Sequence, residues 1–245
     1  MLVKICGLKL PGDARFAADA GADLLGVVVS QTSPRRAALG EARAILALAV
    51  PQPKYLVFGY DDAQYIRETF MALAVAGTRL QIMADHPEIA ELLKLAPTAL
   101  ILPSISAAEP VKPADLTKWE KHPLVLFDSH RPAAGGRVLR PAPRYAEGET
   151  PSALGDQGEA YRDLRPAGGT GKTFNPAHIA GIKRPYLLAG GLNADNVAGI
   201  VAKVNPPGVD VASGTEASPG VKDPDKVKRF IQNAKRTAQA MQVQQ

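Results

Sequence analysis

Residues 186–214, YLLAGGLNADNVAGIVAKVNPPGVDVASG, contain a complete strand, turn, helix and strand. The apolar run Tyr186–Ala189 is followed by a glycine pair, an amphipathic stretch at Ala194–Val204 and a second apolar run at Val209–Ala212. Short apolar runs that alternate with helical patterns are typical of βα units, in which helices connect parallel strands. The segment therefore predicts two neighbouring parallel strands joined by one helix.

The same alternation recurs along the whole chain. Strands are expected at Leu2–Cys6, Asp23–Val29, Tyr55–Tyr60, Arg79–Met83, Ala99–Pro103, Leu124–Asp128, Tyr186–Ala189 and Val209–Ala212. Helices are expected at Pro11–Ala20, Glu41–Leu48, Ala63–Ala76, Pro87–Leu95, Pro176–Ile182, Ala194–Val204 and Pro224 to about Ala240, with a short one within Lys112–Lys121. Eight βα units match the roughly 250 residues of a closed (β/α)₈ barrel, whereas open doubly wound sheets usually have fewer strands. The predicted fold class is α/β, a single TIM barrel domain spanning residues 1–245.

One segment departs from this alternation. Between His130 and Gly171, glycine and proline supply 13 of 42 residues. This share exceeds the roughly 25–30% that is typical of low-complexity or disordered chain. We therefore expect a long, flexible insertion rich in Gly, Pro and Arg at 130–167, in the loop after the sixth strand. A tolerated surface insertion and a lid over the site both fit its composition and place.

Composition narrows the class of partner. The chain has 29 Lys and Arg residues against 24 Asp and Glu, a net charge of +5, which favours anionic partners. Aromatic residues make up only 5%, and the basic residues lack the interleaved aromatics of a base-stacking surface, so no nucleic-acid partner is expected. No apolar run reaches the roughly 18–20 residues of a membrane helix, and the N-terminal segment lacks the features of a secretory signal. We expect a cytoplasmic protein without a membrane partner.

Cysteine and histidine usage limits the chemistry. Cys6 is the only cysteine, which excludes an internal disulfide and a zinc site built on several thiolates. The four histidines are dispersed without metal-ligand spacing, so no metal site is expected.

Candidate catalytic residues stand where strands of the predicted barrel end, because TIM-barrel sites are built at the C-terminal ends of strands. Cys6 is either a small core residue or, as a thiolate, a nucleophile or base whose pKa nearby positive charge lowers. Asp128 closes the sixth strand and fits a turn residue and a general acid equally well, because desolvation favours its protonated form.

Two turns are candidates for binding a phosphate. Gly190 and Gly191 follow the seventh strand, and Ser213 and Gly214 follow the eighth, where TIM barrels frequently bind phosphate. A helix that begins near Asn193 would direct backbone N–H groups toward such an anion.

Two further sets of charged residues are notable. Arg35 and Arg36 in the second βα loop are either a solvated basic pair or a guanidinium fork for a substrate carboxylate. Lys4 lies on the same face of its strand as Cys6, because strand residues alternate with period two. If that face points into the barrel, the buried ammonium group needs a carboxylate, and Asp210 on the adjacent eighth strand is the candidate partner.

Six motifs, in order along the chain, resemble the phosphoribosylanthranilate isomerase family. They are Val3-Lys4-Ile5-Cys6-Gly7; Ser33-Pro34-Arg35; Leu126-Phe127-Asp128; Gly168-Gly169-Thr170-Gly171-Lys172-Thr173-Phe174; Leu188-Ala189-Gly190-Gly191-Leu192-Asn193; and Val209-Asp210-Val211-Ala212-Ser213-Gly214-Thr215-Glu216 with Pro219-Gly220-Val221-Lys222-Asp223. Each motif is loose by itself, but six in sequence on a barrel pattern are highly specific.

The resemblance implies a cofactor-free isomerase of tryptophan biosynthesis that rearranges N-(5-phosphoribosyl)anthranilate to 1-(2-carboxyphenylamino)-1-deoxyribulose 5-phosphate. In this family pattern Asp128 is the general acid at the ring oxygen, and Cys6 is the general base at C2 of the sugar. Arg35 would hold the anthranilate carboxylate. The other substrate-binding residues implied are Gly190, Gly191, Asn193, Asp210, Ser213 and Gly214.

The chain departs from the family pattern at two strands, and other functions stay open. The family's Gln-Leu-His-Gly reads Gln81-Ile82-Met83-Ala84, and its Val-Gly-Val-Phe reads Val57-Phe58-Gly59-Tyr60. The alternatives are a non-catalytic barrel that binds a phosphorylated metabolite and a related sugar-phosphate isomerase with dual substrate range. The latter would want an acidic base in place of Cys6. The expected partner is a phosphorylated small molecule, and the expected state is a monomer or homodimer. Association with other tryptophan-pathway enzymes stays open.

Overall fold

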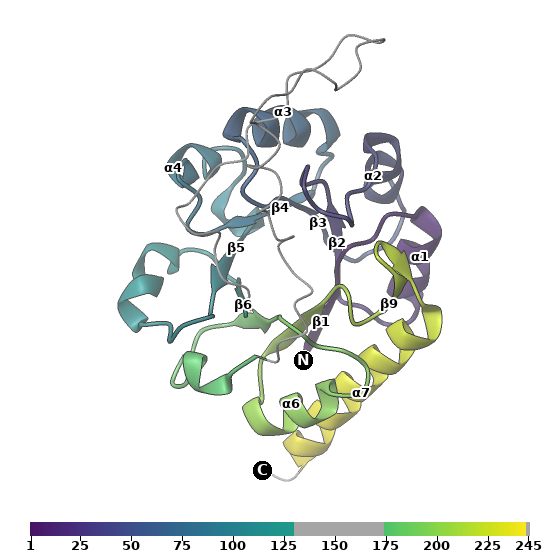
Figure 1. Ribbon diagram of the computed structural model, residues 1–245, viewed down its shortest axis with the longest axis vertical. Coiled ribbons are helices and arrows are strands. Elements are labelled where there is room, and N and C mark those ends of the chain that lie inside the picture. Colours follow the sequence, from purple (N-terminus) through teal and green to yellow (C-terminus); the bar gives the residue numbers. More distant parts are fainter. Residues whose placement is uncertain (130–173, 244–245) are drawn as a thin grey trace, which may run out of the picture.

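Eight parallel strands close into a barrel in the computed structural model, which describes residues 1–129 and 174–243 (Figure 1). In chain order they are β1 (Leu2–Ile5), β2 (Leu24–Val28), β3 (Lys54–Val57), β4 (Arg79–Met83), β5 (Ile101–Ser106), β6 (Val125–Asp128), β7 (Tyr186–Leu188) and β8 (Gly208–Val211). The barrel closes because β8 pairs with β1, in a register that sets Lys4 opposite Asp210. The predicted α/β fold, a (β/α)₈ TIM barrel, is confirmed, and each expected strand is present within a few residues of its expected bounds.

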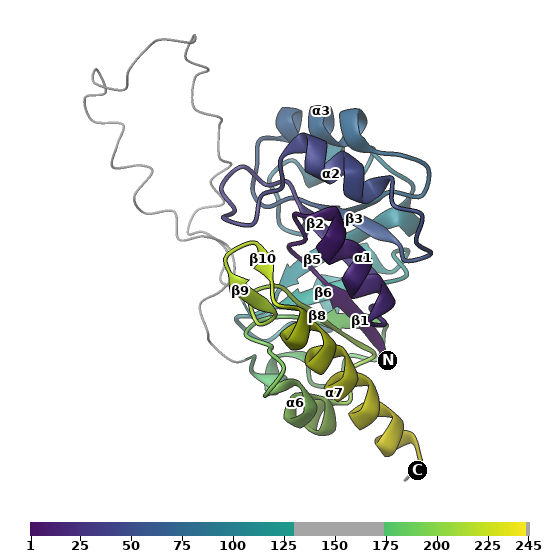
Figure 2. The ribbon, with the colours of Figure 1, turned by 90° about the vertical axis from the view of Figure 1, so that its right-hand side faces the viewer.

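Helices surround the barrel (Figures 1 and 2). They are α1 (Pro11–Asp19), α2 (Leu39–Leu46), α3 (Ala63–Leu73), α4 (Ile89–Leu92), α6 (Val197–Val204) and α7 (Pro224–Val243), with 3₁₀ helices η1 (Thr98–Leu100), η2 (Pro113–Trp119) and η3 (Pro176–Ile179). The long α7 packs against α6 and α1, so the C-terminal helix joins the last and first units of the barrel.

Two expected helices are shorter than the sequence pattern predicted. The stretch Pro87–Leu95 contains only the four-residue α4, and Pro176–Ile182 forms the 3₁₀ helix η3. In η3 the chain has little room to continue, because Gly181 adopts a left-handed φ of 80° before the start of β7. Apolar spacing alone did not reveal these early ends.

A small antiparallel hairpin follows β8 and was not expected from the sequence. Its strands are β9 (Glu216–Ser218) and β10 (Val221–Lys222), and Gly220 in the turn has a φ of 80°. Figure 2 shows the hairpin beside the end of the barrel at which β8 finishes. It brings two charged residues, Glu216 and Lys222, into buried positions.

The core has two parts. A large apolar cluster lies between strands and helices and includes Val3, Ile5 and Phe230, all fully buried. A smaller cluster contains one or two residues from most strands: Leu24, Tyr55, Leu102, Leu126, Leu187 and Ala189. Lys4 reaches this second cluster, since its Nζ lies 5.9 Å from the centre of the Tyr55 ring. Val3 and Ile5 therefore face the helices, while Lys4 and Cys6 face the barrel interior.

The expected flexible insertion at 130–167 lies outside the described residues. The glycine-rich motif that begins at Gly168 also lies outside them, apart from Phe174 at its end. Within the described part of the chain, no helix combines the length and apolar character needed to cross a membrane.

Candidate active site

Cys6 lies where β1 ends and the chain turns away from the barrel. Its backbone N–H donates a hydrogen bond of 2.8 Å to the Val211 carbonyl of β8, and the residue is 5% exposed. Gly7 makes the turn with a φ of 76°, a conformation that glycine adopts at little cost. The thiol is thus held at the inner rim of the barrel by the last pairing between β1 and β8.

Lys4 and Asp210 form a buried ion pair inside the barrel. Lys4 Nζ lies 2.8 Å from Asp210 Oδ1, and the Lys4 side chain is fully buried. Burial by itself would lower the Lys4 pKa, but the Asp210 carboxylate, together with Cys6, holds that pKa above its usual value. The predicted pair is confirmed, and Lys4 keeps its charge.

Gly26 of β2 provides the space in which the Cys6 and Lys4 side chains meet. A Cβ atom added at Gly26 would lie 2.7 Å from Cys6 Sγ and 3.0 Å from Lys4 Nζ. Burial raises the pKa of the Cys6 thiol above its usual value, and the ammonium group of Lys4 opposes this shift without cancelling it. The site therefore contains a buried thiol with a cation beside it.

Asp128 is the last residue of β6, at the same end of the barrel as Cys6. It pairs in register with Ser106 of β5, and its carbonyl accepts a 2.7 Å hydrogen bond from the Ala107 N–H. The negative charge of Asp128 raises the pKa of Asp210, and the negative charge of Asp210 raises the pKa of Cys6. The two candidate proton-transfer residues, Cys6 and Asp128, thus belong to one electrostatic cluster at the C-terminal ends of the strands.

Arg35 extends from the loop after β2 into a buried ion pair. Its Nε lies 2.8 Å from Glu216 Oε1 and its Nη2 3.1 Å from Oε2, which is a two-point contact. A Cβ added at Gly7 would lie 3.0 Å from Arg35 Cδ, so this side chain passes directly beside the Cys6-Gly7 turn.

Lys222 of the β9–β10 hairpin completes this group. Its Nζ lies 3.4 Å from Glu216 Oε1 and donates a hydrogen bond of 2.8 Å to the carbonyl oxygen of Ala212. Burial lowers the pKa of Lys222, and Glu216 opposes that shift. The sequence reasoning assigned no role to Glu216 or Lys222, although both stand in the motif after the eighth strand.

The turns after β7 and β8 lie side by side. An isolated parallel bridge joins Asn193 to Gly214. Gly190 and Gly191 adopt φ values of 99° and 66°, and a Cβ at Gly190 would overlap the Ser129 side chain. A Cβ at Gly214 would overlap the carbonyl oxygen of Leu192 in the same way. Glycine is therefore required where the two turns approach their neighbours.

Asn193 shapes the first of these turns through its own hydrogen bonds. Its Oδ1 accepts 2.9 Å bonds from the backbone N–H groups of Asp195 and Asn196, and its own N–H donates to Asn196 Oδ1 at 2.8 Å. Asn196 also donates to the Gly191 carbonyl at 2.9 Å. The structure thus gives Asn193 a positioning role, while direct contact with a substrate stays a prediction.

Comparisons with known proteins identify the family of the chain. A family model described as N-(5'phosphoribosyl)anthranilate (PRA) isomerase matches residues 156–233. A relative from Halorhodospira halophila, named N-(5'-phosphoribosyl)anthranilate isomerase, is 33% identical over 237 residues, covering 96% of each chain. The chain belongs to this isomerase family. A second relative of the same name, from Xanthomonas euvesicatoria, is 31% identical over 240 residues, which cover 96% of this chain and 93% of the relative.

Solved structures of the isomerase family share the fold. Phosphoribosyl anthranilate isomerase from Thermotoga maritima is 28% identical with a TM-score of 0.67, covering 96% of this chain and 99% of the other. The protein named TrpF from Jonesia denitrificans is 26% identical with a TM-score of 0.68, covering 97% and 98% of the two chains.

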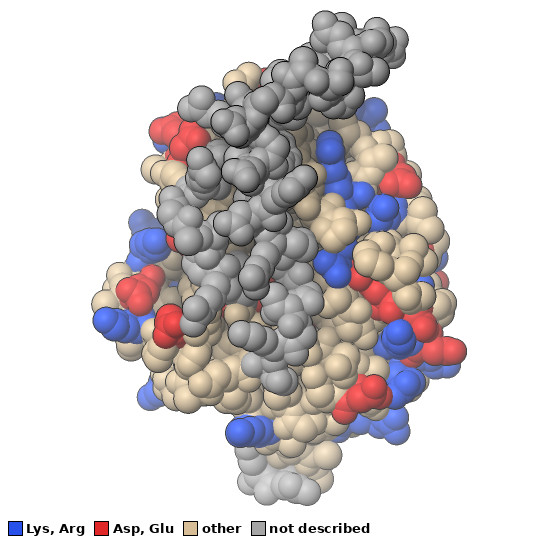
Figure 3. Space-filling model, viewed as in Figure 1, with Lys and Arg blue, Asp and Glu red and all other residues tan. Residues whose placement is uncertain are grey.

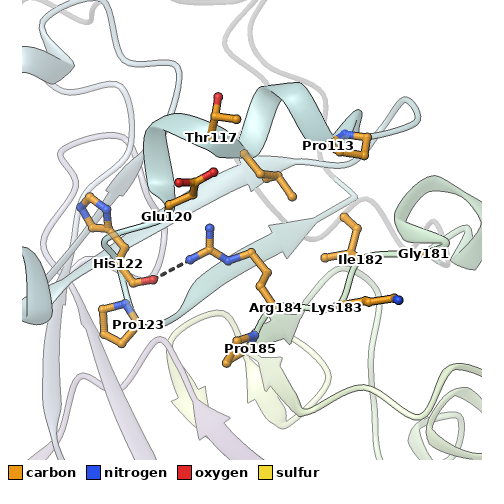
Figure 4. A pocket seen from close by; sticks show the side chains of 11 residues that line it. Pro113, Thr117, Glu120, His122, Pro123, Gly181, Ile182, Lys183, Arg184 and Pro185 are labelled. Carbon is orange, nitrogen blue, oxygen red and sulfur yellow. Dashed lines mark hydrogen bonds between the residues drawn. The ribbon is translucent and has the colours of Figure 1, made fainter.

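A separate cavity lies away from the candidate active site, which is at the C-terminal ends of the strands. Its volume is about 380 Å³, and it opens between η2 and the residues that precede β6 and β7 (Figure 4). Arg184 lines it and donates from Nη2 to the carbonyl oxygens of Trp119 and His122. Because this cavity is at the N-terminal ends of the strands, it is not where TIM barrels build their catalytic sites.

Proposed function

We propose that this chain is an N-(5'-phosphoribosyl)anthranilate isomerase that opens the ribose ring and moves its carbonyl function by an Amadori rearrangement. The isomerase function in tryptophan biosynthesis follows from the family. The observation that carries the assignment to particular residues is the position of Cys6 and Asp128. Both stand at the C-terminal ends of strands and are linked electrostatically through Asp210.

Asp128 and Cys6 divide the proton transfers. Asp128 in its protonated form gives a proton to the furanose ring oxygen, the C1–O bond breaks with its electrons going to that oxygen, and an iminium forms. The Cys6 thiolate then removes the proton from C2, which gives an enolamine that tautomerises to the ketone. Each positioned acid or base contributes roughly 10²–10⁴-fold to the rate. The proposed reaction requires no cofactor, because its steps are proton transfers and the cleavage of one C–O bond, with no external oxidant or reductant.

The two adjacent turns after β7 and β8 are the proposed phosphate site. Their contributing residues are Gly190, Gly191, Ser213 and Gly214. Close packing of the turns, joined at Asn193 and Gly214, supports this assignment, because backbone N–H groups of such turns and of the following helix bind anions well. Asp210 supports the site from within the barrel by holding Lys4.

Arg35 is the proposed ligand of the anthranilate carboxylate. Glu216 engages its Nε and Nη2 atoms, so we assign Nη1 to the substrate. The position of Arg35 beside the Cys6-Gly7 turn supports this role, since the anthranilate group is attached at C1, next to the C2 proton that Cys6 removes.

The test is an assay of the purified chain with N-(5-phosphoribosyl)anthranilate, followed by loss of the substrate's anthranilate fluorescence. Cys6→Ser and Asp128→Asn should each lower kcat by roughly 10²–10⁴-fold. Asp19→Asn, the same chemical change at an exposed position at the end of α1, should leave kcat unchanged.

Full turnover by the Cys6→Ser, Asp128→Asn double variant would refute the assignment of residues. Tight binding of a product analogue without turnover by the native chain would instead support a non-catalytic barrel.

The negative charge of a phosphorylated substrate is complementary to the net charge of +5 on the chain. Figure 3 shows basic side chains interspersed with acidic ones around the described part of the face viewed along the barrel. A single phosphorylated metabolite needs only local positive charge, which the buried Arg35 and Lys222 supply near the strand ends. We propose that the chain acts on such a metabolite in the cytoplasm as a monomer or homodimer.

A further inference from the structure

Lys4 and Cys6 converge on one point inside the barrel. Lys4 is in β1 and Cys6 directly follows it, so the two residues are two positions apart and share the inner face of the strand. Ile5 of β1 pairs with Leu25 of the neighbouring strand β2, and Gly26 is the next residue of β2 after that pair. Both Cys6 Sγ and Lys4 Nζ occupy the space above Gly26 that a side chain would fill. Both atoms lie within 3.0 Å of the position that a Gly26 Cβ would take, so the ammonium group and the thiol are close neighbours.

A fully buried lysine at this place requires a physical reason. Removing a charged pair from water costs free energy, and apolar residues of similar volume often stabilise a protein equally well or better. Apolar residues in place of both Lys4 and Asp210 would fill this space without that cost. The pair of Lys4 with Asp210 therefore points to a function of the charge itself.

We propose that Lys4 is a positioning residue that holds its ammonium group against Cys6 and so stabilises the thiolate that acts as general base. This inference rests on the proposed function and extends it to a residue outside the acid and base pair. Asp210 fixes the direction of the ammonium group through its 2.8 Å contact and keeps Lys4 protonated.

The charged groups around Cys6 come from three elements. Lys4 on β1 and Lys222 on β10 favour the thiolate, and Asp210 on β8 opposes it, with Lys4 acting more strongly than Asp210. Asp128 on β6 raises the pKa of Asp210. Burial favours the neutral thiol and has the largest effect, so the pKa of Cys6 lies above its usual value, and Lys4 is the group that opposes this rise most strongly. Lys222 donates to the Ala212 carbonyl and contacts Glu216, and its effect on Cys6 is weaker than that of Lys4.

The protons balance without a further reactant. In the free enzyme the thiol loses its proton to solvent, and Lys4 stays protonated throughout. The thiolate takes the C2 proton from the iminium and becomes a thiol. When the enolamine tautomerises, this thiol protonates C1, and the proton released from the 2-hydroxyl returns, directly or through solvent, to the carboxylate of Asp128. Lys4 neither gains nor loses a proton in the cycle, so its effect is on the pKa of Cys6.

The single cysteine makes this pKa directly measurable. Thiolate absorbance near 240 nm would be titrated against pH, with the spectrum of Cys6→Ser subtracted to remove tyrosine. Lys4→Met should raise the midpoint by about one pH unit or more, which is about tenfold less thiolate at a given lower pH. Lys4→Arg should restore a midpoint close to that of the native chain. Lys203→Met, the same change at an exposed position of α6, should leave it unchanged.

Activity supplies a second readout. The ascending limb of kcat/KM against pH should move to higher pH in Lys4→Met by the same amount as the thiol titration. A purely structural role would lower kcat/KM at every pH and leave the position of that limb unchanged.

A folded Lys4→Met variant with the native thiol midpoint would overturn the inference. If Lys4→Met does not fold, Lys4→Gln and Lys4→Arg carry the test, and equal midpoints in those two variants would also overturn it. The thiol titration needs no turnover, so its outcome is separate from that of the isomerase assay. A native chain that turns over substrate while Lys4 leaves the thiol unaffected would keep the proposed function and remove only the role of Lys4.

Discussion

Gly26 is the residue whose missing side chain allows the thiol and the ammonium group to meet. In Gly26→Ala, the added Cβ would lie 2.7 Å from Cys6 Sγ and 3.0 Å from Lys4 Nζ, so both groups must move. We expect a loss of roughly 1–3 kcal/mol in the free energy of unfolding, as for other overpacked cores, together with a lower kcat. Urea denaturation and the fluorescence assay would measure the two effects.

Gly199→Ala is the matched control for this prediction. Gly199 lies within α6, and a Cβ there would meet no atom within 4 Å. The substitution should stabilise the chain by about 0.5–1 kcal/mol, because alanine favours the helix, and should leave kcat unchanged. Equal behaviour of the two variants would contradict the packing that we describe around Cys6.

Glu216 connects Arg35 to Lys222, and its charge should control how well Arg35 binds substrate. In Glu216→Gln the shape is kept, but the guanidinium loses its ionic partner and its fixed direction. We expect KM to rise about tenfold, equivalent to about 1.4 kcal/mol, with a smaller change in kcat. Steady-state kinetics would measure both, with the exposed Glu88→Gln as control. A fall in kcat at constant KM would contradict a role in binding.

Among the contacts of single residues, some could be predicted from the sequence and others could not. The pair of Lys4 and Asp210 could be inferred because strand alternation and the closure of the barrel place the two residues on adjacent strands. The contact of Arg35 with Glu216 spans 181 residues and depends on the β9–β10 hairpin. No apolar run in the sequence predicts this hairpin.

Asn193 caps the turn after β7, and its removal should affect one element in two ways. Asn193→Ala removes the acceptor for two backbone N–H groups, so we expect a loss of about 0.5–2 kcal/mol in unfolding free energy, as for other caps. The turn also carries the proposed phosphate site, so inhibition by inorganic phosphate should weaken.

Asn175→Ala separates these two effects. Asn175 accepts a 3.1 Å bond from the Ala177 N–H at the start of η3, and it is not one of the residues of the proposed phosphate turns. This variant should lose similar stability while its inhibition constant for phosphate stays at the native value. A shift of that constant in Asn175→Ala as well would indicate a global effect.

His122 stands between η2 and β6, and its titration should make stability depend on pH. Its ring packs edge-on against Trp119 with centroids 5.1 Å apart, and both ring nitrogens are buried without a hydrogen-bond partner among the described residues. Burial, helped by the positive charge of Arg184, lowers the pKa of His122. Below about pH 6.5 the unfolded chain takes up this proton more readily than the folded one, so stability falls as the pH decreases.

The variant His122→Phe should remove this contribution and keep the ring contact with Trp119. The difference in unfolding free energy between native and variant chains should change with pH below 6.5 by at most about 1.4 kcal/mol per unit, and be constant above it. Urea denaturation at pH 5, 6, 7 and 8 would measure it. A constant difference across all four values would contradict the lowered pKa.

Among the elements, strands were predicted more closely than helices. A buried parallel strand is a short apolar run with turn residues at both ends, and this signal is local. The ends of α4 and η3 depend instead on where the chain must turn to enter the next strand, as at Gly181. Spacing of apolar residues does not contain that information.

Closure of the barrel couples the two ends of the chain. Leu2 pairs with Gly208 and Ile5 with Val211, so the first strand completes its hydrogen bonding only when the last is in place. We therefore expect the described barrel to unfold as one unit. The single tryptophan, Trp119, is 1% exposed and lies in η2, which connects β5 to β6 and so is several strands away from the pairing of β1 with β8 in the barrel order. Its fluorescence and far-UV circular dichroism should show coincident urea transitions, whereas separate midpoints would reveal independent units.

The sequence alone was sufficient for the number and order of the strands, the closed barrel and the positions of Cys6 and Asp128 at strand ends. These features follow from hydrophobic periodicity and turn residues, which act over a few positions. Only the tertiary structure showed that Glu216 binds Arg35, that Lys222 is buried beside it, and that Gly26 lets Lys4 reach Cys6. These contacts join residues distant in the chain, and their energies depend on burial and distance, which exist only once the barrel has closed.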